Sequence, residues 1–131
     1  RDFDMIVLPG GLPGADHLDR DTRLRALITR AASAGRFVAA ICAAPKVLVS
    51  AGLLDNRIAT SFPGVLDPAK VPGLSYRDDA VVQDGKIITS RGPGTAMDFA
   101  LTLIENLVGK EKRDQVEAAL QRPRQPKAIA N

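Results

Sequence analysis

The sequence is poor in the residues that build metal centres and aromatic binding surfaces. Its 131 residues include one cysteine, one histidine, no tryptophan and 4% aromatic residues. A single cysteine cannot form a disulfide within the chain, and one cysteine with one distant histidine does not indicate a metal site. The scarcity of aromatic rings argues against base stacking, although the net charge is +3. We therefore expect no metal and no nucleic-acid partner.

Long hydrophobic runs are also missing. No apolar stretch approaches the roughly 20 residues that cross a bilayer, so we expect no membrane association. A lone cysteine fits a reducing compartment, which favours the cytoplasm. With 45% apolar and 25% charged residues, the composition is that of one globular domain. We assign that domain to residues 1–120 and a mobile tail to residues 121–131.

Continuous apolar runs alternate along the chain with segments in which apolar residues recur at helical spacing. The runs at 4–8 and 37–41 predict strands buried on both faces, as in a parallel sheet. Between them, leucine and isoleucine recur with helical spacing from residue 18 to a stop at Gly35. The other expected elements are a helix at 44–51, a strand at 57–61, a hairpin at 80–90 that turns at Asp84-Gly85, a helix from 96 that stops at Gly109, and a short helix at 110–120.

This order predicts an α/β fold with a mostly parallel sheet and an antiparallel hairpin at one edge. Ligands of such sheets bind beyond the carboxyl ends of the strands. Three loops follow expected strands, at 9–14, 42–45 and 91–94. We expect these loops to converge on one site.

The only cysteine, Cys42, lies where a strand ends and a helix begins. A nucleophile at such a corner requires a sharp, strained turn with small neighbours, and residues 39, 40, 43 and 44 are all alanine. The amino end of a helix favours a thiolate, and the amides of Ala43 and Gly11 would stabilise an adjacent oxyanion. The alternative is a cysteine that only fills space in the core. Sequence spacing alone leaves both interpretations open.

Three segments in order resemble signature segments of the ThiJ/PfpI superfamily: DMIVLPGG at 4–11, AAICAAP at 39–45 and TSRGPGT at 89–95. The similarity is greatest to the branch of the Parkinson-disease-associated protein deglycase and its YajL-like bacterial relatives, and it runs from about residue 4 to residue 120. It implies a flavodoxin-like three-layer α/β sandwich and a homodimer. It also implies that Cys42 is the reactive residue of a nucleophile elbow, with Gly11 and Ala43 as amide donors and Gly10 shaping the loop.

The resemblance further implies an enzyme of glyoxalase III or protein deglycase type that needs no cofactor. Its substrates would be small 2-oxoaldehydes such as methylglyoxal and glyoxal, or the early glycation adducts that they form on side chains. The alternative implied function is a redox-sensing chaperone that protects against oxidative stress through oxidation of Cys42.

Some family features are not present in this sequence. The family's general acid/base is a glutamate near the cysteine, whereas the glutamates here are Glu105, Glu111 and Glu117, in the C-terminal helical region. Because the chain begins at Arg1 without Met, we expect an N-terminal strand–helix unit that carries this glutamate to be missing. Ala43 replaces the histidine of protease-like members, and no histidine follows Cys42, which disfavours amidotransferases. Arg91 would shape the site, either by holding loops or by binding an anion.

Overall fold

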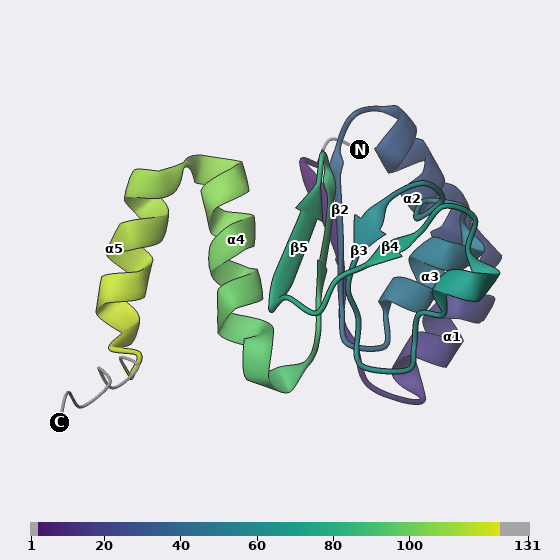
Figure 1. Ribbon diagram of the computed structural model, residues 1–131. Coiled ribbons are helices and arrows are strands. Elements are labelled where there is room, and N and C mark those ends of the chain that lie inside the picture. The colour runs from purple at the N-terminus through teal and green to yellow at the C-terminus, as the bar shows by residue number, and fades with distance from the viewer. Residues whose placement is uncertain (1–2, 124–131) are drawn as a thin grey trace, which may run out of the picture. The chain divides into compact units, whose positions relative to one another are not determined.

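The structure is a computed structural model that describes residues 3–123. These residues fall into two compact units, one ending at Phe99 and the other beginning at Ala100. The first unit contains Cys42 and all the strands of the described part of the chain (Figure 1). Among the described helices, none is both long enough and apolar enough to cross a membrane.

The main sheet of the first unit has the strand order β1-β2-β6-β5. Strands β1 (Met5–Leu8), β2 (Phe37–Ile41) and β6 (Ile87–Ser90) run parallel, and β5 (Val81–Asp84) pairs with β6 in the antiparallel direction. The predicted parallel sheet with an antiparallel edge hairpin is therefore confirmed. In register, Leu8 pairs with Ala40 and Ile41 with Ser90, so the carboxyl ends of the three parallel strands lie at one edge.

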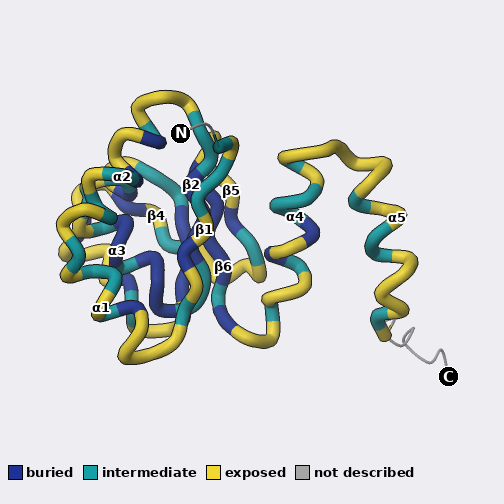
Figure 2. The backbone as a smooth tube through the Cα atoms, turned by 180° about the vertical axis from the view of Figure 1, so that it is seen from behind, coloured by how far each residue is buried: buried dark blue, intermediate teal, exposed yellow. Residues whose placement is uncertain are grey.

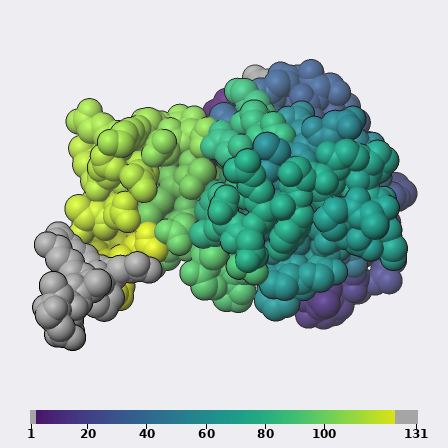
Figure 3. All heavy atoms as spheres, in the orientation of Figure 1, coloured from purple at the N-terminus to yellow at the C-terminus, as the bar shows by residue number. Residues whose placement is uncertain are grey.

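The strand prediction for residues 57–61 is wrong in its length and in its sheet. The strand expected at 57–61 shortens to β3 (Ile58–Ala59), which pairs with β4 (Ser75–Tyr76) in a separate parallel sheet. Where the expected strand would have continued, the amide of Thr60 donates to the side-chain oxygen of Thr89, at 2.9 Å, rather than to a backbone carbonyl of the main sheet. Figure 3 shows the visible face of this unit, where the long connection between β3 and β5 lies.

The hairpin turn also differs from the expectation by one residue. Asp84 pairs with Ile87, which leaves Gly85 and Lys86 as the turn, with Gly85 at φ 61°. The carboxylate of Asp84 accepts a hydrogen bond from the amide of Ile58 at 2.9 Å. Asp84 is therefore held in the strand and links the hairpin to β3.

The single helix expected after the first loop is instead two helices, α1 (Gly14–Arg20) and α2 (Thr22–Ser33). The break occurs at Asp21, whose carboxylate caps α2 by accepting from the amides of Arg23 at 2.9 Å and Leu24 at 3.3 Å. These hydrogen bonds, the one from Leu24 first, lower the pKa of Asp21. Capping residues such as aspartate compete with continuation of a helix, which is why the two helices are separate.

The core lies between the sheet and the helices α1, α2 and α3 (Pro45–Ser50), and Figure 2 shows the buried residues along β2 and β6. The largest fully buried apolar side chains of this unit are Ile28, Leu48, Leu54, Ile88, Val38 and Val47. The prediction that both faces of the first strand are buried is wrong at Val7, which is 44% exposed. Within the described residues β1 is an edge strand, so this side chain is only partly covered.

The remaining elements include two 3-10 turns, η1 (Pro68–Lys70) and η2 (Pro93–Thr95). Helix α4 (Ala96–Val108) crosses from the first unit into the second, and α5 (Lys110–Leu120) follows it. The helix stop predicted at Gly109 is confirmed, since this residue has φ 98°. Within the second unit, Arg113 pairs with Glu105 at 3.8 Å and with Glu117 at 3.3 Å. Most of the predicted tail, residues 124–131, lies outside the described residues.

Candidate active site

The three loops that follow β1, β2 and β6 meet at one edge of the sheet, as the sequence predicts. The backbone amide of Cys42 donates to the carbonyl of Ser90 at 3.0 Å, and Gly10 lies directly against the cysteine. Ala43 is buried next to Cys42, and Arg91 follows Ser90 in the chain. The candidate site therefore contains residues from separate parts of the sequence that neighbouring parallel strands bring together.

Cys42 has a backbone conformation that residues with a side chain rarely adopt. Its φ is 64°, in the left-handed region, and it is the free cysteine of the chain, partly exposed to solvent. Such a conformation costs about 1–3 kcal/mol and persists only where the surrounding structure enforces it. The carbonyl of Cys42 also accepts from the amide of Phe62 at 2.9 Å, so both backbone polar groups are fixed. The strained corner predicted at Cys42 is confirmed.

Gly10 is the residue that allows the first loop to approach the cysteine. A Cβ added at Gly10 would lie 2.5 Å from the Cβ of Cys42, 2.7 Å from the carbonyl oxygen of Ile41 and 3.4 Å from the amide nitrogen of Ala43. No side chain fits there. Gly11 has φ 92°, but a Cβ there would meet no atom within 4 Å. Close approach to the cysteine thus depends on Gly10, whereas Gly11 is required for its backbone angle. The amide-donor roles of Gly11 and Ala43 stay predictions.

The loop at residues 91–94 is held by side chains around it. Arg91 forms an ion pair with Asp78 at 3.0 Å, the loop-holding contact that we considered for it. The hydroxyl of Ser90 donates to the carbonyl of Ala80 at 2.6 Å and lies 2.7 Å from the hydroxyl of Thr95. The Thr95 hydroxyl accepts from the amide of Gly92 at 3.1 Å. Because the carbonyl of Ser90 also accepts a hydrogen bond from the Cys42 amide, this network links the loop after β6 to the cysteine.

An ion pair connects helix α1, which follows the first loop, with helix α3, which follows the second loop. Lys46 on α3 forms an ion pair with Asp16 on α1, and this hydrogen bond lowers the pKa of Asp16. His17 on the same helix is exposed. In the part of the chain that the structure describes, no three histidine, cysteine or acidic side chains gather as a metal site.

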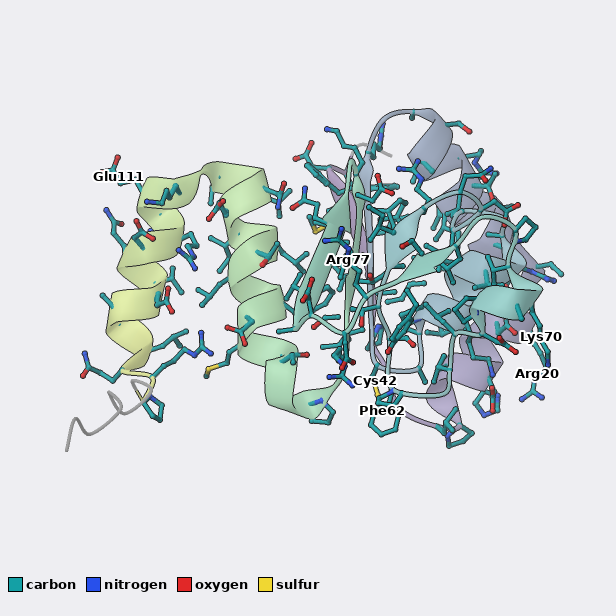
Figure 4. All side chains as sticks on the ribbon, viewed as in Figure 1. Arg20, Cys42, Phe62, Lys70, Arg77 and Glu111 are labelled. Atoms are coloured by element: carbon teal, nitrogen blue, oxygen red, sulfur yellow. The ribbon has the colours of Figure 1, made fainter. Side chains whose placement is uncertain are left out.

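One neighbour of Cys42 was missed by reasoning from the sequence. Phe62 comes from the loop after β3, outside the main sheet, yet its amide bonds to the Cys42 carbonyl. Figure 4 shows the two residues next to each other below the ends of the strands. Spacing along the chain gives no signal for this contact, because β3 belongs to a separate sheet whose position the sequence does not indicate.

The chain is similar to the proteins of one known family. Residues 1–106 match the DJ-1/PfpI family, and 119 residues are 46% identical to the Drosophila melanogaster protein dj-1beta. The chain belongs to the DJ-1/PfpI family. The crystal structure of Drosophila DJ-1beta superposes with a TM-score of 0.86 at 44% identity, over 94% of this chain and 66% of that one. The predicted flavodoxin-like α/β fold class of this DJ-1/PfpI member is thereby confirmed.

Two other members of the DJ-1/PfpI family bear on function. A Caenorhabditis elegans protein named glutathione-independent glyoxalase DJR-1.2 is 38% identical over 116 residues, which are 88% of this chain and 61% of that protein. A structure of oxidized Toxoplasma gondii DJ-1 has a TM-score of 0.81 at 38% identity, over 91% of this chain and 64% of that one. The chain spans 63% of the length of Drosophila dj-1beta.

The contact between Gly10 and Cys42 gives a direct prediction. Gly10→Ala places a methyl group where the Cys42 Cβ and the Ile41 carbonyl lie, so the loop or the cysteine corner must shift. Overpacking of this kind costs about 1–3 kcal/mol. We expect the rate constant for alkylation of Cys42 by iodoacetamide to change by about tenfold or more, with a lower free energy of unfolding in urea.

Gly14→Ala is the matched control, because a Cβ at Gly14 meets nothing within 4 Å and this residue begins helix α1. Its alkylation rate and stability should stay near those of the unmodified protein. Equal alkylation rates and equal stabilities for Gly10→Ala and Gly14→Ala would show that the loop does not constrain Cys42.

Proposed function

We propose that this DJ-1/PfpI member is a cysteine-dependent glyoxalase or deglycase that needs no cofactor and acts on 2-oxoaldehydes or their early glycation adducts. The observation that carries the proposal is the partly exposed Cys42, held with φ 64° at a strand-to-helix corner. A relative named glutathione-independent glyoxalase supports this choice of reaction. Nucleophiles in α/β enzymes are presented at such corners.

In the first step the Cys42 sulfur adds to the aldehyde carbon of methylglyoxal. A C–S bond forms, and the π electrons of the carbonyl move to its oxygen. That oxyanion would accept hydrogen bonds from the amides of Gly11 and Ala43, and protonation gives a hemithioacetal. Preorganised donors of this kind stabilise the developing charge without reorganisation.

In the second step a base moves the proton on the former aldehyde carbon to the neighbouring carbonyl carbon, and the hydroxyl proton of the hemithioacetal passes to the oxygen of that neighbouring carbonyl. The first carbon is thereby oxidised to a thioester and the second reduced to an alcohol, so no external oxidant is needed. Water then cleaves the C–S bond, releases a 2-hydroxy acid and returns the proton to sulfur. The glutamate expected from the sequence, which would be this base, stays a prediction, as does the homodimer.

Replacing the sulfur tests the proposal. In the full-length protein, Cys42→Ala and Cys42→Ser should each reduce the conversion of methylglyoxal to lactate by at least about a hundredfold, because neither side chain is an effective thiol nucleophile. Lactate is measured enzymatically against a protein-free reaction. Asp55→Ala, at an exposed position, is the control and should retain full activity. Equal lactate production by Cys42→Ala and the unmodified protein would end this proposal.

A redox-sensing role, coupled to protection of other proteins, is the second candidate. The Toxoplasma gondii relative has a solved structure in an oxidized form. In this chain, the partly exposed Cys42 is the residue suited to accept oxygen as sulfenic and then sulfinic acid. A sulfinate would use the same amides of Gly11 and Ala43 as the oxyanion of the enzyme mechanism.

This second role predicts selective oxidation. After mild peroxide treatment, peptide mass spectrometry should show two added oxygens on Cys42 before the methionines change. Met97 is the internal reference, since its side chain is 47% exposed. Oxidation confined to Met5 and Met97 would remove the basis for redox sensing at Cys42.

A further inference from the structure

Phe62 is a large apolar side chain that stays 48% exposed while its backbone is joined to the candidate nucleophile. Its amide donates to the Cys42 carbonyl at 2.9 Å, which keeps the two residues adjacent. In Figure 4, Phe62 lies next to Cys42 at the edge where the strand ends meet. An exposed phenylalanine is not unusual by itself, but here the position beside a thiol is fixed.

The loop that carries Phe62 is held from several directions. The carbonyl of Phe62 accepts from the amide of Val65 at 3.0 Å and from the hydroxyl of Ser61 at 2.9 Å. The hydroxyl of Tyr76 in turn donates to the carbonyl of Ser61 at 3.2 Å. These bonds restrict the backbone of the loop, so the Cα of Phe62 stays near the candidate nucleophile.

The ring of Phe62 also packs against the loop that follows β6. A Cβ added at Gly92 would lie 3.4 Å from the ring carbon Cδ1 of Phe62, so the ring packs over the glycine of the loop after β6. Gly92 is buried, whereas about half of Phe62 remains accessible. One side of the ring therefore rests on protein backbone, and the accessible part is available to a group bound beside the sulfur.

We infer that Phe62 is a specificity-determining residue that selects carbonyl substrates with an apolar or aromatic substituent next to the reacting aldehyde. The inference rests on the proposed addition of Cys42 to a carbonyl carbon. Contact of the ring with an aryl group buries apolar surface and adds the attraction between aromatic rings, whereas the methyl group of methylglyoxal covers little of it. Phe62 thus favours arylglyoxals over the smallest 2-oxoaldehydes.

The test compares two aldehydes. The ratio of kcat/KM for phenylglyoxal to that for methylglyoxal should fall about tenfold in Phe62→Ala, since this is the scale of a ring–ring contact with its buried area. Turnover of methylglyoxal itself should change less than about threefold. Val108→Ala, a truncation of a 63% exposed apolar residue in α4, is the control and should leave the ratio unchanged.

A second measurement does not depend on turnover. Alkylation of Cys42 by N-benzyl iodoacetamide should be faster, relative to iodoacetamide, in the unmodified protein than in Phe62→Ala, with the product mapped to the Cys42 peptide. Thermal unfolding of Phe62→Ala checks that the fold is retained, and Phe62→Leu should give an intermediate ratio if the fold is lost on truncation. A protein without glyoxalase turnover whose alkylation ratio still falls in Phe62→Ala would overturn the proposed function, and with it the choice among carbonyl substrates, but would retain the contact of the ring with apolar groups bound at Cys42. Unchanged alkylation ratios in both variants would overturn the inference.

Discussion

The close contact between Gly10 and Cys42 is the constraint on which the candidate site depends. With 2.5 Å between a hypothetical Cβ at Gly10 and the Cβ of Cys42, only a glycine allows the first loop to lie where it does. On the other side, the amide of Cys42 bonds to Ser90 and its carbonyl to Phe62. Held in this way, the cysteine keeps a left-handed backbone that a free loop would relax.

The position of the site follows from the parallel sheet. Strands β1, β2 and β6 are direct neighbours and end at the same edge. The sheet alone therefore brings together the loops that follow these strands. The Ser90–Thr95 hydroxyl pair and the ion pair between Arg91 and Asp78 then fix the third loop. The helices α1 and α3, which follow the first two loops, are joined by an ion pair between their side chains. The proposed chemistry uses this rigidity, because a nucleophile and its amide donors act only when their positions are fixed beforehand.

The sequence predicted those features that depend on local patterns. Continuous apolar runs indicated β1 and β2, and the alanines around Cys42 indicated a tight corner. Features that depend on side-chain hydrogen bonds were missed. Asp21 caps α2 and separates it from α1, and the carboxylate of Asp84 accepts from the amide of Ile58, which holds Asp84 in the strand rather than in the turn. The hydroxyl of Thr89 accepts a hydrogen bond from the amide of Thr60. The contact of Phe62 with the site could not be predicted either, since it arises from a small second sheet whose strands have only two residues each.

The backbone strain at Cys42 is tested most directly by comparing the free energies of unfolding of Cys42→Gly and Cys42→Ala. At an ordinary helical position, such as the exposed Ala26 in α2, alanine is more stable than glycine by about 1 kcal/mol. At φ 64° the order should reverse, because glycine adopts this conformation without strain, and Cys42→Gly should be more stable than Cys42→Ala by about 1 kcal/mol. If Cys42→Ala equals or exceeds Cys42→Gly in urea unfolding, the surrounding structure does not force the cysteine into the left-handed region.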